Sequence, residues 1–342
     1  MIDRMRVLVV LTRLPVVLLL GLFTATGLAH AGAGNDPLLL GKALVVVVAF
    51  LLFSVVVNDM ADEAIDRVNL PDGGRPLVTG TRDRADMVRI ASVAAATAVA
   101  ASLLLGPMAL AVTVAGLALS LAYSVRPVRL ADRGVVASLL LPAGYVAVPY
   151  LLGVLAVRPV VQPADLVLLV GLYVGFIGRI VLKDFRDVRG DALFGKRTFL
   201  VRHGRRRTCA VSAWCWVLGA ATLVGVRGAD ISLAVAYVAY VSAALVLLRA
   251  LATDGGARRD EALISAIAIV GRGTIVTVVA HLAMLDARWT ALRSAALLAA
   301  LATVFIGQAV TMVRQGPRSR LTVPAAWATD SVGDGDVSRA EV

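Results

Sequence analysis

Long apolar runs recur along the whole chain and constrain its fold more than any other feature. A helix that crosses a bilayer needs about 20 apolar residues, and it satisfies its backbone polar groups internally. Arg272 and His281 interrupt the ninth run, so nine or ten transmembrane helices are predicted in an all-α polytopic bundle. The runs occupy residues 14–30, 38–57, 87–105, 108–124, 134–156, 164–182, 208–226, 230–251, 263–285 and 290–313.

Composition supports this assignment and argues against a water-soluble protein. Apolar residues make up 59% of the chain and the mean hydropathy is +0.85, both high for a soluble domain. The net charge of +11 would suggest nucleic-acid binding in a soluble protein. Here the charges lie in short segments between apolar runs, as in membrane-protein loops. We therefore expect no nucleic-acid partner, and the sequence gives no reason to infer an obligate protein partner.

The distribution of Lys and Arg predicts an orientation in the cell membrane. With the N-terminus in the cytoplasm, the six inner segments carry 3, 4, 3, 9, 2 and 4 basic residues. The outer segments carry only Arg158, Arg227, Arg288 and Arg293. This bias predicts that both termini are cytoplasmic. Residues 1–313 are predicted to form the transmembrane domain, and residues 314–342 a polar, disordered tail.

Two Asp-rich motifs follow the second and sixth apolar runs, on the side predicted to be cytoplasmic. In both, aspartates recur at spacings of three and then four, which places them along one face of a helix. Six carboxylates at two helix ends would repel each other unless cations neutralised them. The first motif contains Asn58, Asp59, Asp62 and Asp66, and the second contains Lys183, Asp184, Asp187 and Asp191.

Magnesium would meet this need for neutralising charge. Mg²⁺ prefers carboxylate oxygens and completes its coordination with water and substrate phosphates. Two carboxylate clusters facing across a cavity would clamp a diphosphate through bridging ions and neutralise a leaving pyrophosphate. Arg75, Lys196 and Arg197 follow the motifs and suit the remaining phosphate oxygens. A solvated loop with surface ion pairs would explain one motif equally well, but the matched pair favours a binding site.

With these motifs the chain resembles the UbiA family of intramembrane prenyltransferases over residues 10–285. The family's first signature, N-D-x-x-D-x-x-x-D followed by R-P-L, matches residues 58–66 and 75–77. Its second, K-D-x-x-D-x-x-G-D with a later G-x-x-T, matches residues 183–191 and 195–198. A third patch, Tyr123-Ser124 before Pro127 and Arg129, is similar to the family's loop after the fourth helix.

The resemblance implies helices around a central cavity open sideways to lipid, with the prenyl tail along an apolar wall. The six aspartates would bind Mg²⁺ and act in catalysis. Many relatives have a lysine where this chain has Ala131 and Asp132, so either Arg126 or Arg129 would supply that charge, or the phosphate contact differs in this chain. The implied diphosphate-binding residues are Asn58, Arg75, Tyr123, Arg126, Arg129, Lys183, Lys196 and Arg197.

The implied function is Mg²⁺-dependent transfer of a polyprenyl group from its diphosphate to an aromatic or lipid acceptor. The partners are thus a prenyl diphosphate and a lipophilic acceptor, and the protein is integral to the membrane. A terpene cyclase of the same fold, acting without acceptor, is the alternative. A transporter or channel is disfavoured because the aspartates lie at helix ends rather than at mid-membrane. The acceptor and the prenyl chain length stay open.

Overall fold

The computed structural model describes residues 11, 13–69, 75–185, 198–224, 230–253 and 256–316, and over these residues it contains helices and no strands. The predicted all-α class is confirmed. The long helices are α2 (Leu14–His30), α3 (Pro37–Ala61), α5 (Arg84–Leu103), α6 (Pro107–Ser124), α9 (Pro163–Ile180), α11 (Phe199–Val224), α12 (Ile231–Ala252), α13 (Ala257–Asp286) and α14 (Ala291–Gln315). Shorter pieces are α4 (Glu63–Asn69), η1 (Leu130–Asp132), α7 (Val135–Pro142), η2 (Ala143–Ala147) and α8 (Val148–Val157).

Each of the ten predicted apolar runs coincides with a helical segment. Within the described residues, eight helices are long and apolar enough to cross a membrane, with Val135–Val157 counted as one. Helix α2 is a shorter apolar helix. Helix α11 begins at Phe199, earlier than the predicted run, because its arginine-rich first turns are helical without being apolar. The chain is therefore a multi-pass membrane protein. The predicted tail beyond residue 316 lies outside the described residues.

Proline and short acidic side chains set where several helices begin. Proline occupies the first turn of α3, α6 and α9, where its missing N–H costs no hydrogen bond. The Asp36 carboxylate accepts a hydrogen bond from the backbone N–H of Leu39 at 2.9 Å and so caps α3. Gln162 and Asp165 form a capping box at the start of α9. Local sequence thus fixes these helix boundaries.

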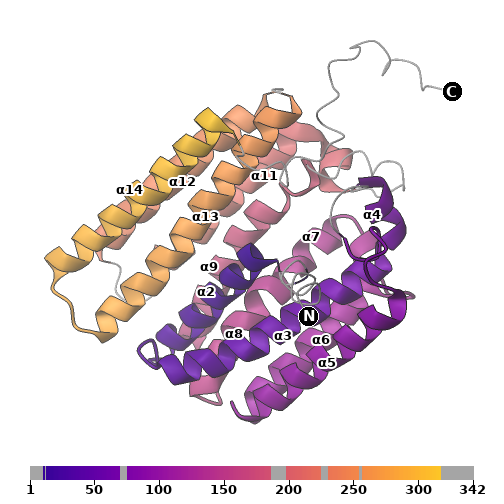
Figure 1. Ribbon diagram of the computed structural model, residues 1–342. Helices are drawn as coiled ribbons and strands as arrows, with labels where there is room; N and C mark the ends of the chain where they lie inside the picture. Colours follow the sequence, from indigo (N-terminus) through magenta and orange to yellow (C-terminus); the bar gives the residue numbers. More distant parts are fainter. Residues whose placement is uncertain are drawn as a thin grey trace.

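Two groups of helices lie on either side of α2 (Figure 1). Helices α12, α13 and α14 pack together on one side, and α3, α5 and α6 on the other. Helix α2 contacts both α3 and α13, and it also crosses α8 closely. At this crossing a Cβ on Gly27 would lie 2.1 Å from the Tyr150 carbonyl oxygen, and one on Gly153 would lie 2.3 Å from that of Thr24. Two glycines therefore let the backbones of α2 and α8 touch.

The fifth predicted span is not a continuous α-helix. A π-helical segment, η2, separates α7 from α8, and the backbone N–H of Val148 donates to the Ala143 carbonyl oxygen five residues earlier. Pro142 and Pro149 flank this segment and cannot donate backbone hydrogen bonds. Such π-turns are frequent at functional sites. Here the segment carries Tyr145, which lines the cavity described next.

Candidate functional site

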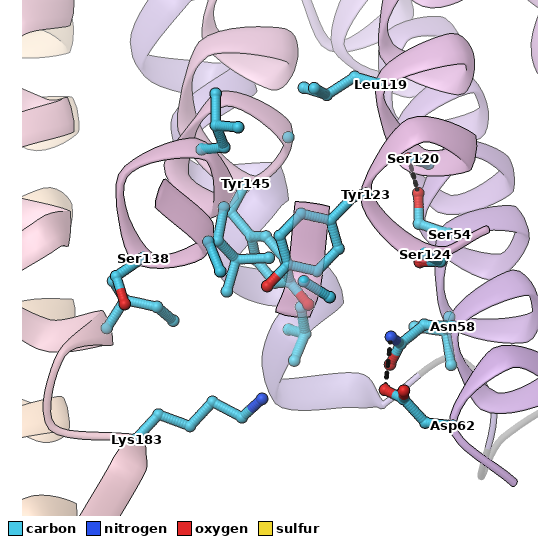
Figure 2. A pocket seen from close by; sticks show the side chains of 18 of the residues that line it. Ser54, Asn58, Asp62, Leu119, Ser120, Tyr123, Ser124, Ser138, Tyr145 and Lys183 are labelled. Atoms are coloured by element: carbon cyan, nitrogen blue, oxygen red, sulfur yellow. Dashed lines mark hydrogen bonds between the residues drawn. The ribbon is translucent and has the colours of Figure 1, made fainter. Parts of the chain in front are cut away.

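A cavity of about 450 Å³ lies between the helices that carry the two Asp-rich motifs. One end is polar, and Figure 2 shows Lys183 facing Asn58 and Asp62 across it. The other end is apolar, with Leu119 far from these groups in the same view. Tyr123 and Tyr145 also line the cavity and lie between the two ends in this view. The cavity thus suits an elongated ligand with a charged head and an apolar tail.

The first Asp-rich motif lies on two helices rather than on one. Helix α3 ends at Ala61, Asp62 is its C-cap with φ −100° and ψ 10°, and α4 starts at the next residue. The Asn58 amide donates to Asp62 Oδ2 at 2.9 Å. Asn58, Asp62 and Asp66 all line the cavity. The motif therefore supplies two cavity-lining carboxylates and one amide.

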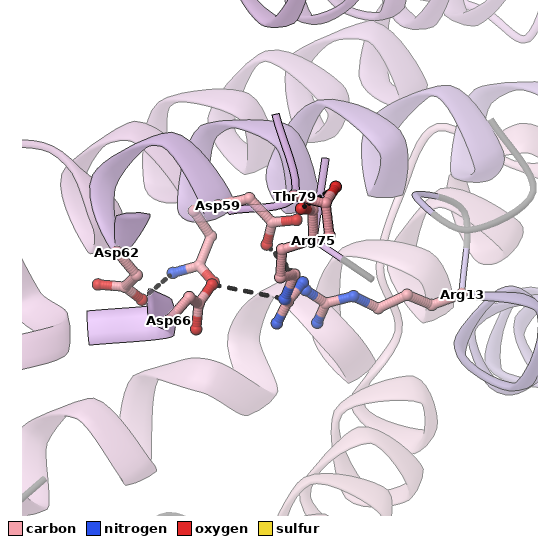
Figure 3. A network of polar contacts seen from close by, with 7 residues as sticks. Arg13, Asp59, Asp62, Asp66, Arg75 and Thr79 are labelled. Atoms are coloured by element: carbon pink, nitrogen blue, oxygen red, sulfur yellow. Dashed lines mark hydrogen bonds and ion pairs between the residues drawn. The ribbon is translucent and has the colours of Figure 1, made fainter. Parts of the chain in front are cut away.

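Asp59 does not line the cavity with its neighbours, unlike the arrangement expected from spacing. It is 3% exposed, and its Oδ1 atom lies 2.6 Å from Arg75 Nη1 and 2.9 Å from Arg13 Nη2. Arg75 Nε also lies 3.4 Å from Asp66 Oδ2. Figure 3 shows the two arginines beside Asp59. Because both arginines line the cavity, Asp59 orients cations that face it.

Arg13 was missed as a site residue. It immediately precedes the first apolar run, so it has the sequence signature of an ordinary membrane-flanking cation. Its contact with Asp59 joins residues 46 positions apart, and no local pattern signals such a pairing. Its predicted location on the same side of the membrane as the Asp-rich motifs is the one signal that was available.

The second motif reaches the cavity through the turn that follows α9. Lys183 and Asp184 line the cavity, as does Thr198 farther along the chain. The Lys183 backbone N–H donates to the Ile180 carbonyl oxygen at 3.0 Å, which continues the helical turn. The predicted site residues Asp187, Asp191, Lys196 and Arg197 lie outside the described residues.

Of Arg126 and Arg129, the two arginines predicted to bind the diphosphate in the loop after α6, only Arg129 contacts the first motif among the described residues. Its Nη2 atom lies 2.8 Å from Asp62 Oδ1, and its Nε atom 2.6 Å from Asp132 Oδ2. Its Nη1 atom donates to the Ala61 carbonyl oxygen at 2.9 Å. Arg126 is exposed. Arg129 therefore supplies positive charge beside Asp62, although it binds the carboxylate from outside the cavity lining.

The carboxylates that share the cavity have the chemistry to hold Mg²⁺. Within the described part of the chain, no three His, Cys, Asp or Glu side chains form a ready metal-binding group. Mg²⁺ does not need one, because it commonly takes one or two carboxylates and completes its shell with water and phosphate oxygens. Asp62, Asp66 and Asp184 line the same space. These donors fit Mg²⁺ if a diphosphate supplies the remaining ligands.

Several hydroxyl groups along the cavity wall were also missed. Ser54 and Ser120 are hydrogen-bonded across α3 and α6, with 2.6 Å between their Oγ atoms. Ser124, Ser138 and Tyr145 line the same space. Isolated hydroxyls inside apolar runs resemble ordinary helix residues, so only Ser124, which belongs to the Tyr123-Ser124 patch, carries a signal in the sequence. Together they give the wall polar groups above the carboxylates.

Comparison with known proteins places these features in one family. A sequence profile described as the UbiA prenyltransferase family matches residues 19–269. The bacteriochlorophyll synthase 34 kDa chain of Chloroflexus aurantiacus is 29% identical over 153 residues, which cover 44% of this chain and 48% of that relative. The digeranylgeranylglyceryl phosphate synthase of Methanoculleus marisnigri is 33% identical over 205 residues, covering 56% and 63%. The chain thus spans less than two thirds of either relative.

Solved structures share the fold. A UbiA homolog from Archaeoglobus fulgidus bound to DMAPP and Mg²⁺ superposes with a TM-score of 0.54. The match covers 90% of this chain and 99% of the homolog, at 16% sequence identity. The homolog bound to GPP and Mg²⁺ gives the same TM-score and coverage. At this level of identity the similarity concerns the arrangement of helices.

Proposed function

The chain belongs to the UbiA prenyltransferase family, and on this basis we propose that it is a Mg²⁺-dependent intramembrane prenyltransferase. The reaction moves a prenyl group from its diphosphate to an aromatic or lipid acceptor. The names of the relatives, bacteriochlorophyll synthase and digeranylgeranylglyceryl phosphate synthase, support this reaction class. The homolog bound to DMAPP and Mg²⁺ supports the substrate and the ion.

One observation carries the proposal. A single cavity brings Asn58, Asp62 and Asp66 together with Lys183 and Asp184, although the two motifs are more than 100 positions apart in the chain. Carboxylates beside a lysine suit a metal-bound diphosphate. The apolar far end suits the hydrocarbon tail. Neither a plain lipid-facing surface nor a solvated loop would require this combination.

In this mechanism the chain's residues divide the substrate between the two ends of the cavity. Asp62, Asp66 and Asp184 would hold Mg²⁺, which neutralises charge on the departing pyrophosphate. Lys183 and Arg75 would bind its outer oxygens. The bond that breaks joins C1 of the prenyl group to the diphosphate oxygen. The bonding electrons leave with pyrophosphate, and C1 becomes an allylic cation. An electron-rich acceptor atom then bonds to C1 and loses its proton.

The two tyrosines mark where C1 would lie. Tyr123 and Tyr145 stand between the charged and apolar ends (Figure 2). Tyr145 stacks on Phe176, with ring centroids 5.9 Å apart and an interplanar angle of 20°. Packed aromatic rings at this level would keep water from the cation while it awaits the acceptor. Their position therefore favours transfer over hydrolysis.

Metal removal tests the proposal directly. Full-length protein in detergent, given a prenyl diphosphate and a lipid extract containing acceptors, should release pyrophosphate and form a prenylated product. EDTA should abolish both signals, and added Mg²⁺ should restore them. Mass spectrometry of the products identifies the acceptor. A cyclic hydrocarbon formed from the diphosphate alone would instead establish the cyclase, and full activity in EDTA would refute metal dependence.

Arg129 should support activity through Asp62. The Arg129→Gln change removes the cation 2.8 Å from Asp62 Oδ1, and loss of such a supporting contact at a metal ligand typically costs about 10–100-fold in activity. We expect a fall of this size in pyrophosphate release, together with a higher Mg²⁺ requirement. Arg133→Gln is the charge-matched control, since Arg133 is exposed in the same loop. Equal effects of the two changes would contradict this role.

We also propose that the polar end of the cavity faces the cytoplasm. The Lys and Arg distribution supports this orientation. Arg13 pairs with Asp59 and Arg129 pairs with Asp62, three residues apart at the end of α3, so both arginines would share one side of the membrane. A cysteine introduced at Arg133 should resist membrane-impermeant thiol reagents in intact cells and react in inside-out vesicles. Labelling in intact cells but not in inside-out vesicles would show that the polar end of the cavity faces the outside of the cell.

A further inference from the structure

A second, much smaller cavity of about 40 Å³ lies among α9, α11, α12 and α13. Glycines make room for it on three of these helices: Gly171, Gly175, Gly219 and Gly271. A Cβ on Gly271 would lie 2.6 Å from Arg179 Cδ. The Arg179 side chain therefore rests directly on α13 at a position where only glycine leaves space for it.

Two hydrogen-bond donors at this cavity have no acceptor among the described residues. The two donors are side chains and contribute three buried atoms: Nε and Nη1 of Arg179, and the indole Nε1 of Trp216. Trp216 as a whole is 5% exposed. The other donors nearby are already used, since the Tyr237 hydroxyl donates to the Thr274 carbonyl oxygen at 3.3 Å. Two different helices thus present unused N–H groups to one space.

The same cavity lacks negative charge. None of its lining residues is Asp or Glu, and no ion pair with Arg179 occurs within the described ranges. The guanidinium lies 5.5 Å from the centroid of the Phe176 ring, a cation–π contact. An arginine keeps its charge under all physiological conditions. A buried charge is strongly destabilising unless it is paired. An anion bound beside this guanidinium would therefore stabilise the folded protein.

We propose that this cavity binds a small inorganic monovalent anion of halide size. The space holds only a few water-sized groups, because a cavity needs about 10–15 Å³ on this scale for each water. An organic carboxylate or a phosphate ester is too large. Water alone would satisfy the N–H groups but would leave the arginine charge unpaired. Among the residues that the structure describes, the site shares no lining residue with the cavity of about 450 Å³, and the inference does not rest on the proposed function.

The bound anion would stabilise the C-terminal end of α9. The Arg179 carbonyl oxygen accepts a hydrogen bond from the Leu182 backbone N–H at 3.2 Å, one residue before Lys183. Arg179 therefore belongs to the turn that presents the second motif. An anion held between Arg179 on α9 and Trp216 on α11 would tie these two packed helices together at that turn.

Thermal unfolding of the full-length protein in detergent tests the site. At equal ionic strength, replacing sodium gluconate by sodium chloride or bromide should raise the Tm, with a shift on the order of several degrees at saturating halide. Arg179→Gln should abolish the shift. Arg249→Gln is the charge-matched control and should keep it, because Arg249 is exposed on α12. Trp216→Phe retains a ring without the N–H and should raise the halide concentration needed for half of the shift.

A crystal grown with bromide should show an anomalous peak between Arg179 and Trp216. Equal Tm values in gluconate and halide would overturn the proposal, as would a halide shift that survives Arg179→Gln. A bromide peak without a Tm shift would mean binding only at crystal concentration and would also overturn it. If Arg179→Gln fails to fold, the test is the halide concentration that gives half of the Tm shift in Trp216→Phe. A concentration equal to that of the unaltered protein would reject the site.

Discussion

Replacing Asp62 with Asn should reduce pyrophosphate release by about 100-fold or more. Asp62 lines the cavity, and its two oxygens lie 2.8 Å from Arg129 Nη2 and 2.9 Å from Asn58 Nδ2. Asparagine keeps the shape but removes the charge that would hold Mg²⁺. A catalytic metal supplies several kcal/mol of charge stabilisation, and each ~1.4 kcal/mol is a tenfold change in rate. Steady-state pyrophosphate release measures the effect.

Glu63→Gln is the matched control for this change. Glu63 follows Asp62 directly but pairs with Arg67 on α4, at 2.8 Å, away from the cavity lining. An exposed pair of this kind contributes little, so activity should stay within about twofold of the unaltered protein. Comparable losses in Asp62→Asn and Glu63→Gln would show that net charge at this helix end, rather than ligation by Asp62, supports catalysis.

Gly153→Ala should lower the Tm by an amount on the order of 5 °C. The added methyl group would lie 2.3 Å from the Thr24 carbonyl oxygen and 2.9 Å from the Leu28 backbone nitrogen. Backbone atoms cannot rotate out of the way as a side chain can, so α2 and α8 must separate. Overpacking of this kind costs about 1–3 kcal/mol, and occasionally more. Thermal unfolding in detergent measures the loss.

Gly307→Ala separates this packing effect from helix propensity. A Cβ on Gly307 meets nothing within 4 Å, and the residue lies on the exposed part of α14. Alanine is the better helix former by about 0.5–1 kcal/mol, so the Tm should hold or rise slightly. If Gly153→Ala melted like Gly307→Ala, the close contact of α2 with α8 would not be limiting for stability.

The helices were largely predictable because the membrane imposes one simple rule on each of them. An apolar run must be helical to satisfy its backbone, and every predicted run coincides with a helix. The departures have local causes. Helix α11 starts early because Arg202 and its neighbours form a helix without being apolar, and Gly204, with φ 72°, kinks it. Hydropathy also cannot register the π-helical turn at Ala143–Ala147, whose residues are as apolar as their neighbours.

The candidate site was predictable only where its residues form a local pattern. Asp62, Asp66 and Asp184 were found because repeated spacing marks them, and all three line the cavity. The same spacing suggested an equivalent role for Asp59. Its buried position depends instead on Arg13, a residue 46 positions away. Partnerships across helices depend on packing angles and on the break at Asp62, which a single sequence does not encode visibly.

The π-helical turn in the fifth span makes the cavity wall that carries Tyr145 sensitive to the deletion of a single residue. A π-turn holds one more residue than an α-turn, so deleting a residue within Ala143–Ala147 could restore a regular α-helix without breaking the span. Because the π-turn is what accommodates the extra residue, α7 and α8 would keep their orientation and the change would fall on the turn itself. Such a deletion would remove or shift Tyr145, which lies in the turn and lines the cavity, while leaving the transmembrane topology intact. Evolution could thus reshape the substrate chamber in a single step at this position.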